Sequence, residues 1–355
     1  MTSPLLNRPG AAELQEDPHG LDAAGVAWHY GNPLGEQRAA QRGTALVDRS
    51  QRPVIAVSGP DAATLLNNLL SQKLDDAAEG FSASALDLDM QGHILHHADI
   101  TRVGDTFYLD VPASQADSLI DYLRKMVFWS QVEIERTGLA ILTLLGATLP
   151  VAEQAVFSRE AGWGSVHRVD VAVPRDELGA VVKQLEAEGA QLAGLMAYTA
   201  ERVKELEPEL GIDLDERSIP HEAPTLVDNA VHLHKGCYRG QETVARVDNL
   251  GKSPRLLVML QLDGSAPALP NPGDTLTANG REVGRLGTVV HDCEYGPIAL
   301  GLVKRSALDA GDLQILPDND EQGSPVSASI DPDSIRQDEG PRPGRVAVDK
   351  LRGRQ

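Results

Sequence analysis

A short segment between Lys235 and Arg246 gathers residue types that do chemistry together: cations, glycines, a cysteine and hydrogen-bonding side chains. It reads Lys-Gly-Cys-Tyr-Arg-Gly-Gln-Glu and is closed by Arg246. A cysteine used only for packing lies among apolar neighbours, whereas Cys237 is preceded by Lys235 and followed by Arg239. Positive charge beside a thiol favours the thiolate, which is the reactive form. The segment therefore predicts a reactive thiol at Cys237.

The same segment has the features of a ligand-binding loop. Gly236 and Gly240 permit positive φ angles and close backbone approach, so successive N–H groups can form an anion-binding concavity. Gln241 and Glu242 offer a donor and acceptors to a polar heterocycle. The structural alternative is a simple turn in which Tyr238 packs beside the cysteine and the charged side chains are solvated.

The string Lys-Gly-Cys-Tyr-x-Gly-Gln-Glu-x-x-x-Arg, at residues 235–246, resembles the signature of the YgfZ family of folate-binding proteins, relatives of the glycine-cleavage T-protein (aminomethyltransferase). Looser similarity runs from about Gly25 to Lys304. The resemblance implies an α+β protein with a T-protein-like, ring-like arrangement of three domains: two α+β domains and a C-terminal small β-barrel. It also implies a central pocket for tetrahydrofolate or a one-carbon derivative.

The resemblance further implies a role in assembling or repairing iron–sulfur clusters, including those of proteins that modify tRNA, with iron–sulfur assembly or client proteins as partners. Cys237 is then the catalytic or redox group, and no metal ligand is assigned. The residues expected to contact folate are Lys235, Tyr238, Gln241, Glu242, Arg246 and Glu205. Glu205 is carried over from the register of a folate-contacting glutamate in the T-protein; an ordinary surface helix position explains it equally well.

Two departures from the T-protein pattern argue against simple transfer of its aminomethyl chemistry. The T-protein has an acidic pair, including its catalytic aspartate, after a Gly-x-Ile motif, whereas here Gly92-His93-Ile94 is followed by Leu95 and His96. The T-protein counterpart of the signature is similar to Lys-Gly-Asp-Phe-Ile-Gly, so Cys237 stands where that family has an acid.

Two other functions stay open beside the accessory role. A folate-dependent aminomethyl- or methyltransferase needs a carboxylate at the one-carbon unit, for which Asp87, Asp89 and Asp99 are the candidates. A scaffold that senses folate without turnover needs neither that carboxylate nor the thiol.

Composition limits the classes of partner and compartment. The 355 residues are 41% apolar and carry a net charge of −20, which disfavours broad binding to nucleic acids or anionic membranes.

Cys237 and Cys293 are far apart, which fits a reducing compartment rather than a disulfide framework, and the acids beside Cys293 favour a structural thiol. Residues 1–20 lack a signal-peptide pattern, and the weakly polar stretch 139–152 is too short to span a bilayer. We therefore expect a cytoplasmic protein without a membrane segment.

Composition and periodicity divide the chain into successive parts. We expect a mobile leader over 1–23, a discontinuous folate-binding domain over 24–135 and 196–252, a small α+β domain over 136–195, a β-barrel over 253–317 and a charged, flexible tail over 318–355.

Local patterns predict the elements that position the signature. A β-branched strand at 54–57 precedes a leucine-rich helix at 62–70, followed by an antiparallel meander over 84–111. Alternating valines at 169–173 predict a strand, and the spacing over 178–185 predicts a helix. A helix at 196–206 and a short strand at 230–234 then lead to the signature, which is expected on a loop. In such a strand His232 and His234 would share a face. An Asn279-Gly280 hairpin turn marks the all-β region.

Overall fold

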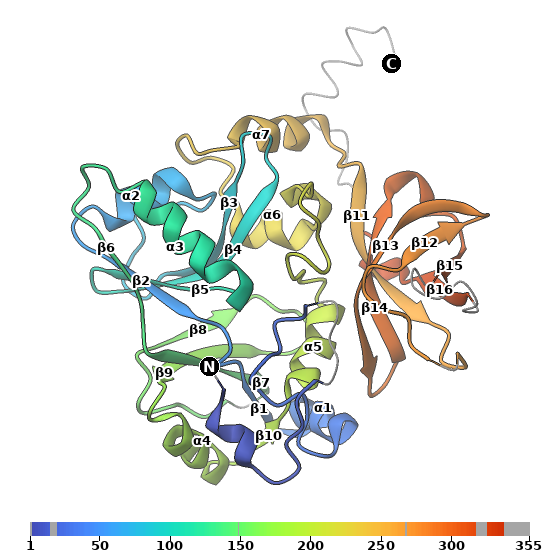
Figure 1. The fold of residues 1–355 in the computed structure, drawn as a ribbon, viewed down its shortest axis with the longest axis horizontal. Coiled ribbons are helices and arrows are strands. Elements are labelled where there is room, and N and C mark those ends of the chain that lie inside the picture. The colour runs from blue at the N-terminus through green and yellow to red at the C-terminus, as the bar shows by residue number, and fades with distance from the viewer. Residues whose placement is uncertain (1, 15–19, 148, 267, 317–324, 337–355) are drawn as a thin grey trace, which may run out of the picture.

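The computed structural model describes residues 2–14, 20–147, 149–266, 268–316 and 325–336. Two units each contain a five-stranded sheet with helices, and a third is a closed barrel. Figure 1 shows the two α+β units stacked on one side of the molecule and the barrel on the other. The predicted combination of α+β units with a C-terminal barrel is confirmed.

The first α+β unit is an antiparallel sheet with two helices on one face. Its strand order is β3-β4-β5-β2-β6. The sheet and its helices are β2 (Val54–Ser58), α2 (Ala62–Leu69), β3 (Ser82–Leu88), β4 (Ile94–Val103), β5 (Thr106–Asp110), α3 (Ala116–Lys125) and β6 (Glu133–Arg136), with the short 3₁₀ helix η2 (Ala113–Gln115) before α3. The predicted meander and leucine-rich helix are confirmed, because Leu65, Leu66 and Leu69 turn one helical face onto the sheet core.

The second α+β unit is a mixed sheet of order β10-β1-β7-β9-β8. Its elements are α1 (Pro33–Arg42), β1 (Thr44–Asp48), β7 (Leu139–Gly146), β8 (Phe157–Ala161), β9 (Arg168–Pro174), α4 (Leu178–Ala187) and β10 (Ala190–Ala193). The predicted strand at 169–173 and helix at 178–185 are confirmed, since their apolar faces share one core. Strand β1 is an inner strand of this sheet, pairing with β10 and β7. Residues 33–48, expected in the first domain, therefore contribute a helix and a strand to the second unit.

The described N-terminal residues pack against the second unit. The 3₁₀ helix η1 (Pro4–Asn7) inserts the side chain of Leu5, which is 3% exposed, into the core of that unit. The hydroxyl of Ser3 donates to the carboxylate of Asp48 on β1. The expected mobile leader is therefore wrong for residues 2–14, because a single buried leucine and a local cap outweigh the polar composition; residues 15–19 lie outside the described part.

Four helical elements connect the sheets to the barrel: α5 (Leu195–Lys204), η3 (Pro220–Glu222), α6 (Pro224–Ala230) and α7 (Gln241–Leu250). The predicted helix at 196–206 is confirmed. The strand expected at 230–234 is wrong, because Pro224 starts a helix that ends at Ala230 and a turn follows. His232 and His234 thus share no strand face.

The barrel closes through strand order β11-β14-β13-β12-β15-β16, with β16 pairing back to β11. Its strands are β11 (Arg255–Leu262), β12 (Thr275–Ala278), β13 (Arg281–Asp292), β14 (Gly296–Lys304), β15 (Asp312–Leu316) and β16 (Val326–Ile330), with 3₁₀ helices η4 (Arg305–Ala307) and η5 (Pro332–Ser334). Asn279 and Gly280 both have positive φ, as the predicted hairpin turn requires.

Strand β16 lies inside the segment expected to form a flexible tail. Val326 and Ala328 point into the barrel core, so a strand-like alternation continues past the acidic stretch. Residues 317–324 and 337–355 lie outside the described residues. Within the part that is described, none of the helices is both long and apolar enough to traverse a bilayer.

Candidate functional site

The signature segment, residues 235–246, forms a loop and the first turns of α7 beside the β3–β4 hairpin (Figure 1). Gly240 precedes the helix with a φ of +82°. A Cβ atom on Gly240 would lie 2.7 Å from the carbonyl oxygen of Asp89 and 3.1 Å from the Cα atom of Gly92. Gly240 therefore allows α7 to approach the hairpin turn closely. Gly236 has open space around its Cα and lacks a positive φ, so the two glycines do not act alike.

Lys235 ties the loop to the end of helix α2. Its ammonium group donates to the backbone carbonyl oxygens of Asn67, Leu70 and Gln72, at 2.6 Å for Leu70 and 2.8 Å for Gln72. An ammonium group has three hydrogens, and these three carbonyls account for all of them. Burial lowers the pKa of Lys235 to about 8. Lys235 therefore acts as a cap for α2 and as an anchor for the signature loop.

Cys237 and Tyr238 face opposite environments. The thiol of Cys237 is free and exposed, whereas Tyr238 is 8% exposed and packs in a core shared by the hairpin, α5, α6 and the barrel. The Tyr238 ring lies 5.1 Å from the Lys235 ammonium nitrogen, and burial raises the Tyr238 pKa to about 12. The buried tyrosine anchors the loop and leaves the thiol at the surface.

Arg239 is held by the first sheet rather than directed at open solvent. Its Nη2 donates to the Asp87 carboxylate at 2.6 Å, and its guanidinium lies 4.6 Å from the centre of the Tyr122 ring. Lys235 and Arg239 are thus both paired within the chain, although the buried Nε of Arg239 lacks a partner among the described residues.

The remaining signature residues lie on the first turns of α7. Gln241 is half-buried, while Glu242 and Arg246 are exposed. Glu242 and Arg246 are four residues apart and so share one helix face. That face and the exposed thiol form the solvent-accessible part of the signature.

Cys293 lies in the turn between β13 and β14, where the barrel contacts helix α1. Its backbone N–H donates to the Gln37 side chain at 2.7 Å. Burial raises the pKa of Cys293, and the neighbouring Asp292 adds to the effect. Both effects agree with a structural role for Cys293, and burial contributes more than the acids.

A central cavity lies between the two α+β units and has two adjoining hollows that share Asp99 and Glu207. The larger hollow has a volume of about 320 Å³ and is lined by β3, β8 and the turn at Trp163. The smaller hollow, of about 40 Å³, is lined by α5 and by the loops after β1 and α5. No signature residue lines either hollow, and neither does Glu205.

A network of ion pairs crosses this cavity. Arg159 bonds Asp110 at 2.5 Å and Asp170 at 3.0 Å, and it lies 3.5 Å from Asp99. Burial alone would raise the pKa of Asp99, but Arg159 and Arg52 outweigh it and lower the pKa to about 2. Asp99 is therefore ionised and charge-compensated at neutral pH.

Glu207 is the cavity glutamate that sequence reasoning missed. Its carboxylate accepts from Arg168 and from the indole N–H of Trp163, and it lines both hollows. Burial opposes ionisation of Glu207, but Arg168 and the Trp163 hydrogen bond lower its pKa to about 2. Glu205, the expected residue, instead accepts from the backbone N–H groups of Gly164 and Ser165. Nothing in the local sequence distinguishes the two glutamates, because the contacts come from β9 and the turn after β8.

The smaller hollow contains polar atoms without a partner among the described residues. They are Asp22 Oδ2, Arg49 Nε, Gln51 Oε1 and His97 Nε2. An unsatisfied buried polar atom costs about 1–3 kcal/mol, so such atoms indicate bound water or a polar ligand. Burial raises the pKa of Asp22 and lowers that of His97, so both shifts favour the neutral form.

The cavity and the signature are thus two separate candidate sites. The cavity offers donors and acceptors beside aromatic side chains, and the signature offers an exposed thiol. Among the described residues, no group of three or more histidine, cysteine, aspartate or glutamate side chains is placed to hold a metal ion.

Comparison with known proteins agrees with this architecture. Residues 255–333 match the family model described as the CAF17 C-terminal beta-barrel domain. The chain is 29% identical to the tRNA-modifying protein YgfZ of Edwardsiella ictaluri, over 66% of this chain and 76% of that protein. It is 28% identical to the human mitochondrial iron–sulfur cluster assembly factor IBA57, over 66% of this chain and 71% of that protein.

The fold has a solved counterpart. The aminomethyltransferase T of the glycine cleavage system from Bartonella henselae superposes with a TM-score of 0.77 and 20% identity, covering 94% of this chain and 97% of that one. At this identity the likeness concerns the fold, and it confirms the expected T-protein-like arrangement. The chain is thus similar in sequence to YgfZ and IBA57 proteins and in fold to an aminomethyltransferase.

Proposed function

We propose that this protein is a folate-binding accessory factor that supports iron–sulfur cluster assembly or repair and, indirectly, tRNA modification, with Cys237 as its reactive thiol. The names of the YgfZ and IBA57 relatives support the biological role. The observation that carries the proposal is the pairing of an exposed cysteine on an anchored loop with a polar cavity elsewhere in the same fold.

The central cavity fits a reduced folate. A volume of about 320 Å³ falls in the range of ligand pockets. Trp163 and Phe81 supply flat apolar surface in the larger hollow, and the unpartnered atoms of Gln51 and Arg49 supply an acceptor and a donor in the smaller one. A pterin has ring N–H groups and ring acceptors that need such partners. When bound, the folate would supply a one-carbon unit carried on its ring nitrogens.

The alternative location for folate is the signature helix. There Gln241, Glu242 and Arg246 would contact the ligand, as the resemblance implies, while Lys235 and Tyr238 would hold the loop. The two locations make different predictions, because a variant in the cavity is remote from α7.

The surroundings of the three candidate carboxylates favour an accessory role over one-carbon transfer. Asp87 is bonded by Arg239 and His96, and Asp89 by His93. Asp99 lines the cavity but is compensated by Arg159 and Arg52. A carboxylate held ionised by two arginines is a poor general acid at neutral pH.

The partners we propose are iron–sulfur assembly or client proteins that meet the exposed face of Cys237, Glu242 and Arg246. The net charge of −20 argues for an indirect effect on tRNA. The two widely separated cysteines are free, which agrees with the reducing, cytoplasmic location that we propose.

The biological test is replacement of the native protein in cells that lack it. The Cys237→Ser variant should fail to restore the activity of iron–sulfur enzymes, whereas Cys293→Ser, a control at the other thiol, should restore it. Full restoration by Cys237→Ser at equal protein level would contradict the reactive-thiol role.

A further inference from the structure

Ser118, His96 and Asp87 form a continuous row of hydrogen bonds on the first α+β unit. The Oγ atom of Ser118 on α3 lies 2.9 Å from Nε2 of His96 on β4. The Nδ1 atom of the same imidazole lies 2.8 Å from Oδ2 of Asp87 on β3. This order of hydroxyl, imidazole and carboxylate is the one by which serine nucleophiles are activated.

The surroundings of Asp87 select the imidazole tautomer that activation requires. Asp87 is fully buried, and its other carboxylate oxygen accepts from Arg239 at 2.6 Å. A carboxylate only accepts hydrogen bonds, so Nδ1 of neutral His96 carries the hydrogen and Nε2 is left as an acceptor. The Ser118 hydroxyl can then donate to His96; when His96 is protonated, the hydroxyl has the Gln115 carbonyl as another acceptor, at 3.0 Å.

Solvent exposure decreases along the row from the hydroxyl to the carboxylate, as the activation of a nucleophile requires. Ser118 is exposed, His96 is 9% exposed and Asp87 is inaccessible to solvent. The nucleophilic residue is therefore exposed while its base is shielded from water.

We propose that Ser118 is a nucleophile toward activated carboxylic esters, with His96 as general base and Asp87 as the residue that orients it. Ser118 Oγ bonds to the ester carbonyl carbon as its proton passes to His96 Nε2, and the alkoxide or phenolate leaves with the electron pair of the broken C–O bond. His96 then returns its proton to a basic leaving group, or to solvent when the leaving group is a stable phenolate. Water, deprotonated by His96, cleaves the acyl–Ser118 bond, and the Ser118 oxygen recovers a proton.

This activity is independent of the proposed folate site. None of the three residues lines either hollow of the central cavity, and none belongs to the signature. Arg239 is the link to the signature, because it holds the carboxylate that orients His96.

The direct test is labelling of the full-length protein with diisopropyl fluorophosphate, followed by peptide mass spectrometry. In this reaction the Ser118 oxygen bonds to phosphorus, fluoride leaves, and the proton passes to His96. We expect the label on Ser118, at least a tenfold slower reaction in His96→Gln, and an unchanged rate in the control Ser114→Ala, an exposed serine on the same segment. Labelling of another residue in the wild-type protein, or none at Ser118, overturns the proposal whether or not a variant folds.

A second measurement separates catalysis from stability. The Asp87→Asn variant can donate to His96 Nδ1 and so favours the wrong tautomer. Its hydrolysis of p-nitrophenyl acetate, followed in a Cys237→Ser background to remove thiol acylation, should fall at least tenfold while its circular dichroism spectrum is retained. Hydrolysis at the unchanged rate by folded Asp87→Asn or Ser118→Ala protein contradicts the proposal.

Discussion

Arg159 on β8 and Asp110 on β5 form an ion pair that joins the two α+β units across the central cavity, at 2.5 Å. The same guanidinium bonds Asp170 on β9 at 3.0 Å. Arg159 and both carboxylates are almost completely shielded from water. These ion pairs join the walls of the cavity. If Arg159 is lost, water cannot solvate the two carboxylates that remain.

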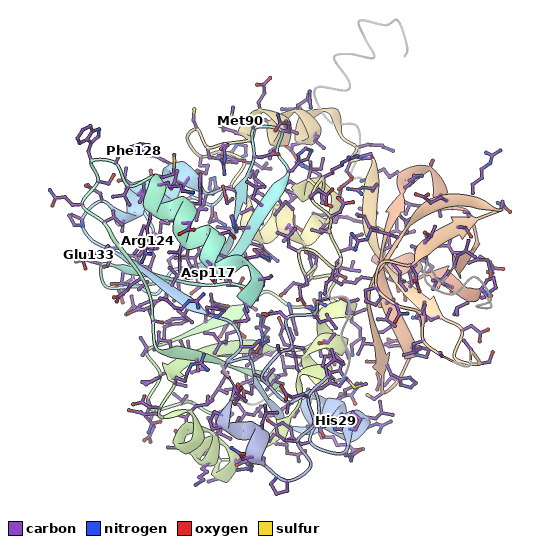
Figure 2. All side chains as sticks on the ribbon, viewed as in Figure 1. His29, Met90, Asp117, Arg124, Phe128 and Glu133 are labelled. Carbon is purple, nitrogen blue, oxygen red and sulfur yellow. The ribbon has the colours of Figure 1, made fainter. Side chains whose placement is uncertain are left out.

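Replacing Arg159 by methionine should therefore destabilise the protein strongly. Removing one member of a buried ion pair leaves uncompensated charge, which typically costs about 3–5 kcal/mol. Urea unfolding of Arg159→Met measures this loss. The matched control is Arg136→Met, whose partner Asp117, labelled in Figure 2, is exposed to solvent. We expect a change of at most about 1 kcal/mol there; similar losses for both variants would contradict the buried network.

Glu209 should make stability fall as pH rises through the weakly acidic range. Burial raises its pKa from 4.5 to about 7, although Arg202 opposes the shift. Between these values the folded carboxyl retains a proton that the unfolded chain releases, so its contribution to stability is complete below pH 4.5 and is lost as pH approaches 7.

The Glu209→Gln variant removes this titration. The difference in free energy of unfolding, Glu209→Gln minus wild type, should increase by up to about 3 kcal/mol between pH 4.5 and pH 7. Urea unfolding at a series of pH values gives the difference, with exposed Glu153→Gln as the control. A constant difference between Glu209→Gln and wild type across this range would show that Glu209 does not titrate as the structure implies.

Lys235→Met should loosen the signature loop. The substitution leaves the carbonyl oxygens of Asn67, Leu70 and Gln72 without their ammonium donor, at a cost of about 3 kcal/mol. Limited proteolysis should show faster cleavage within residues 231–240. The control Lys73→Met removes a half-buried lysine near the same helix end, which pairs with Asp75 and Asp76 and not with the loop, and it should cleave like wild type. Wild-type protection of the loop in Lys235→Met would mean that Lys235 does not anchor it.

The two thiols should differ in reactivity. Cys237 is exposed, whereas burial and Asp292 raise the pKa of Cys293. At about pH 7.5, iodoacetamide should modify Cys237 at least ten times faster than Cys293, because the thiolate is the attacking form. Peptide mass spectrometry gives both rates in one sample, and comparable rates would contradict this ranking.

Local patterns in the sequence predicted the elements whose residues are close along the chain. The Leu65–Leu69 helix face, the valines of β9 and the Asn279-Gly280 turn each depend on a few neighbouring residues. The helix α7 was missed because its start is set by the contact of Gly240 with the hairpin rather than by a capping side chain. Strand β16 was missed because its pairing partners are on β11 and β15.

The sequence likewise predicted only those parts of the candidate sites that depend on neighbouring residues. The exposed thiol of Cys237 follows from a contiguous motif. The cavity does not, because Arg159, Asp110 and Glu207 come from different elements and meet only in the folded chain. Lys235 was expected to contact folate and Arg239 to favour the Cys237 thiolate, but their partners Asn67 and Asp87 lie more than a hundred residues earlier in the sequence.

Calorimetric titration with tetrahydrofolate and its 5-formyl derivative tests the central claim most directly. Ala83→Phe fills the larger hollow without touching the signature, and Arg246→Ala truncates the exposed helix face without touching the cavity. If folate occupies the cavity, wild type and Arg246→Ala bind alike and Ala83→Phe loses at least tenfold in affinity. Absence of binding by the wild-type protein, or binding that only Arg246→Ala weakens, would contradict a folate site in the central cavity.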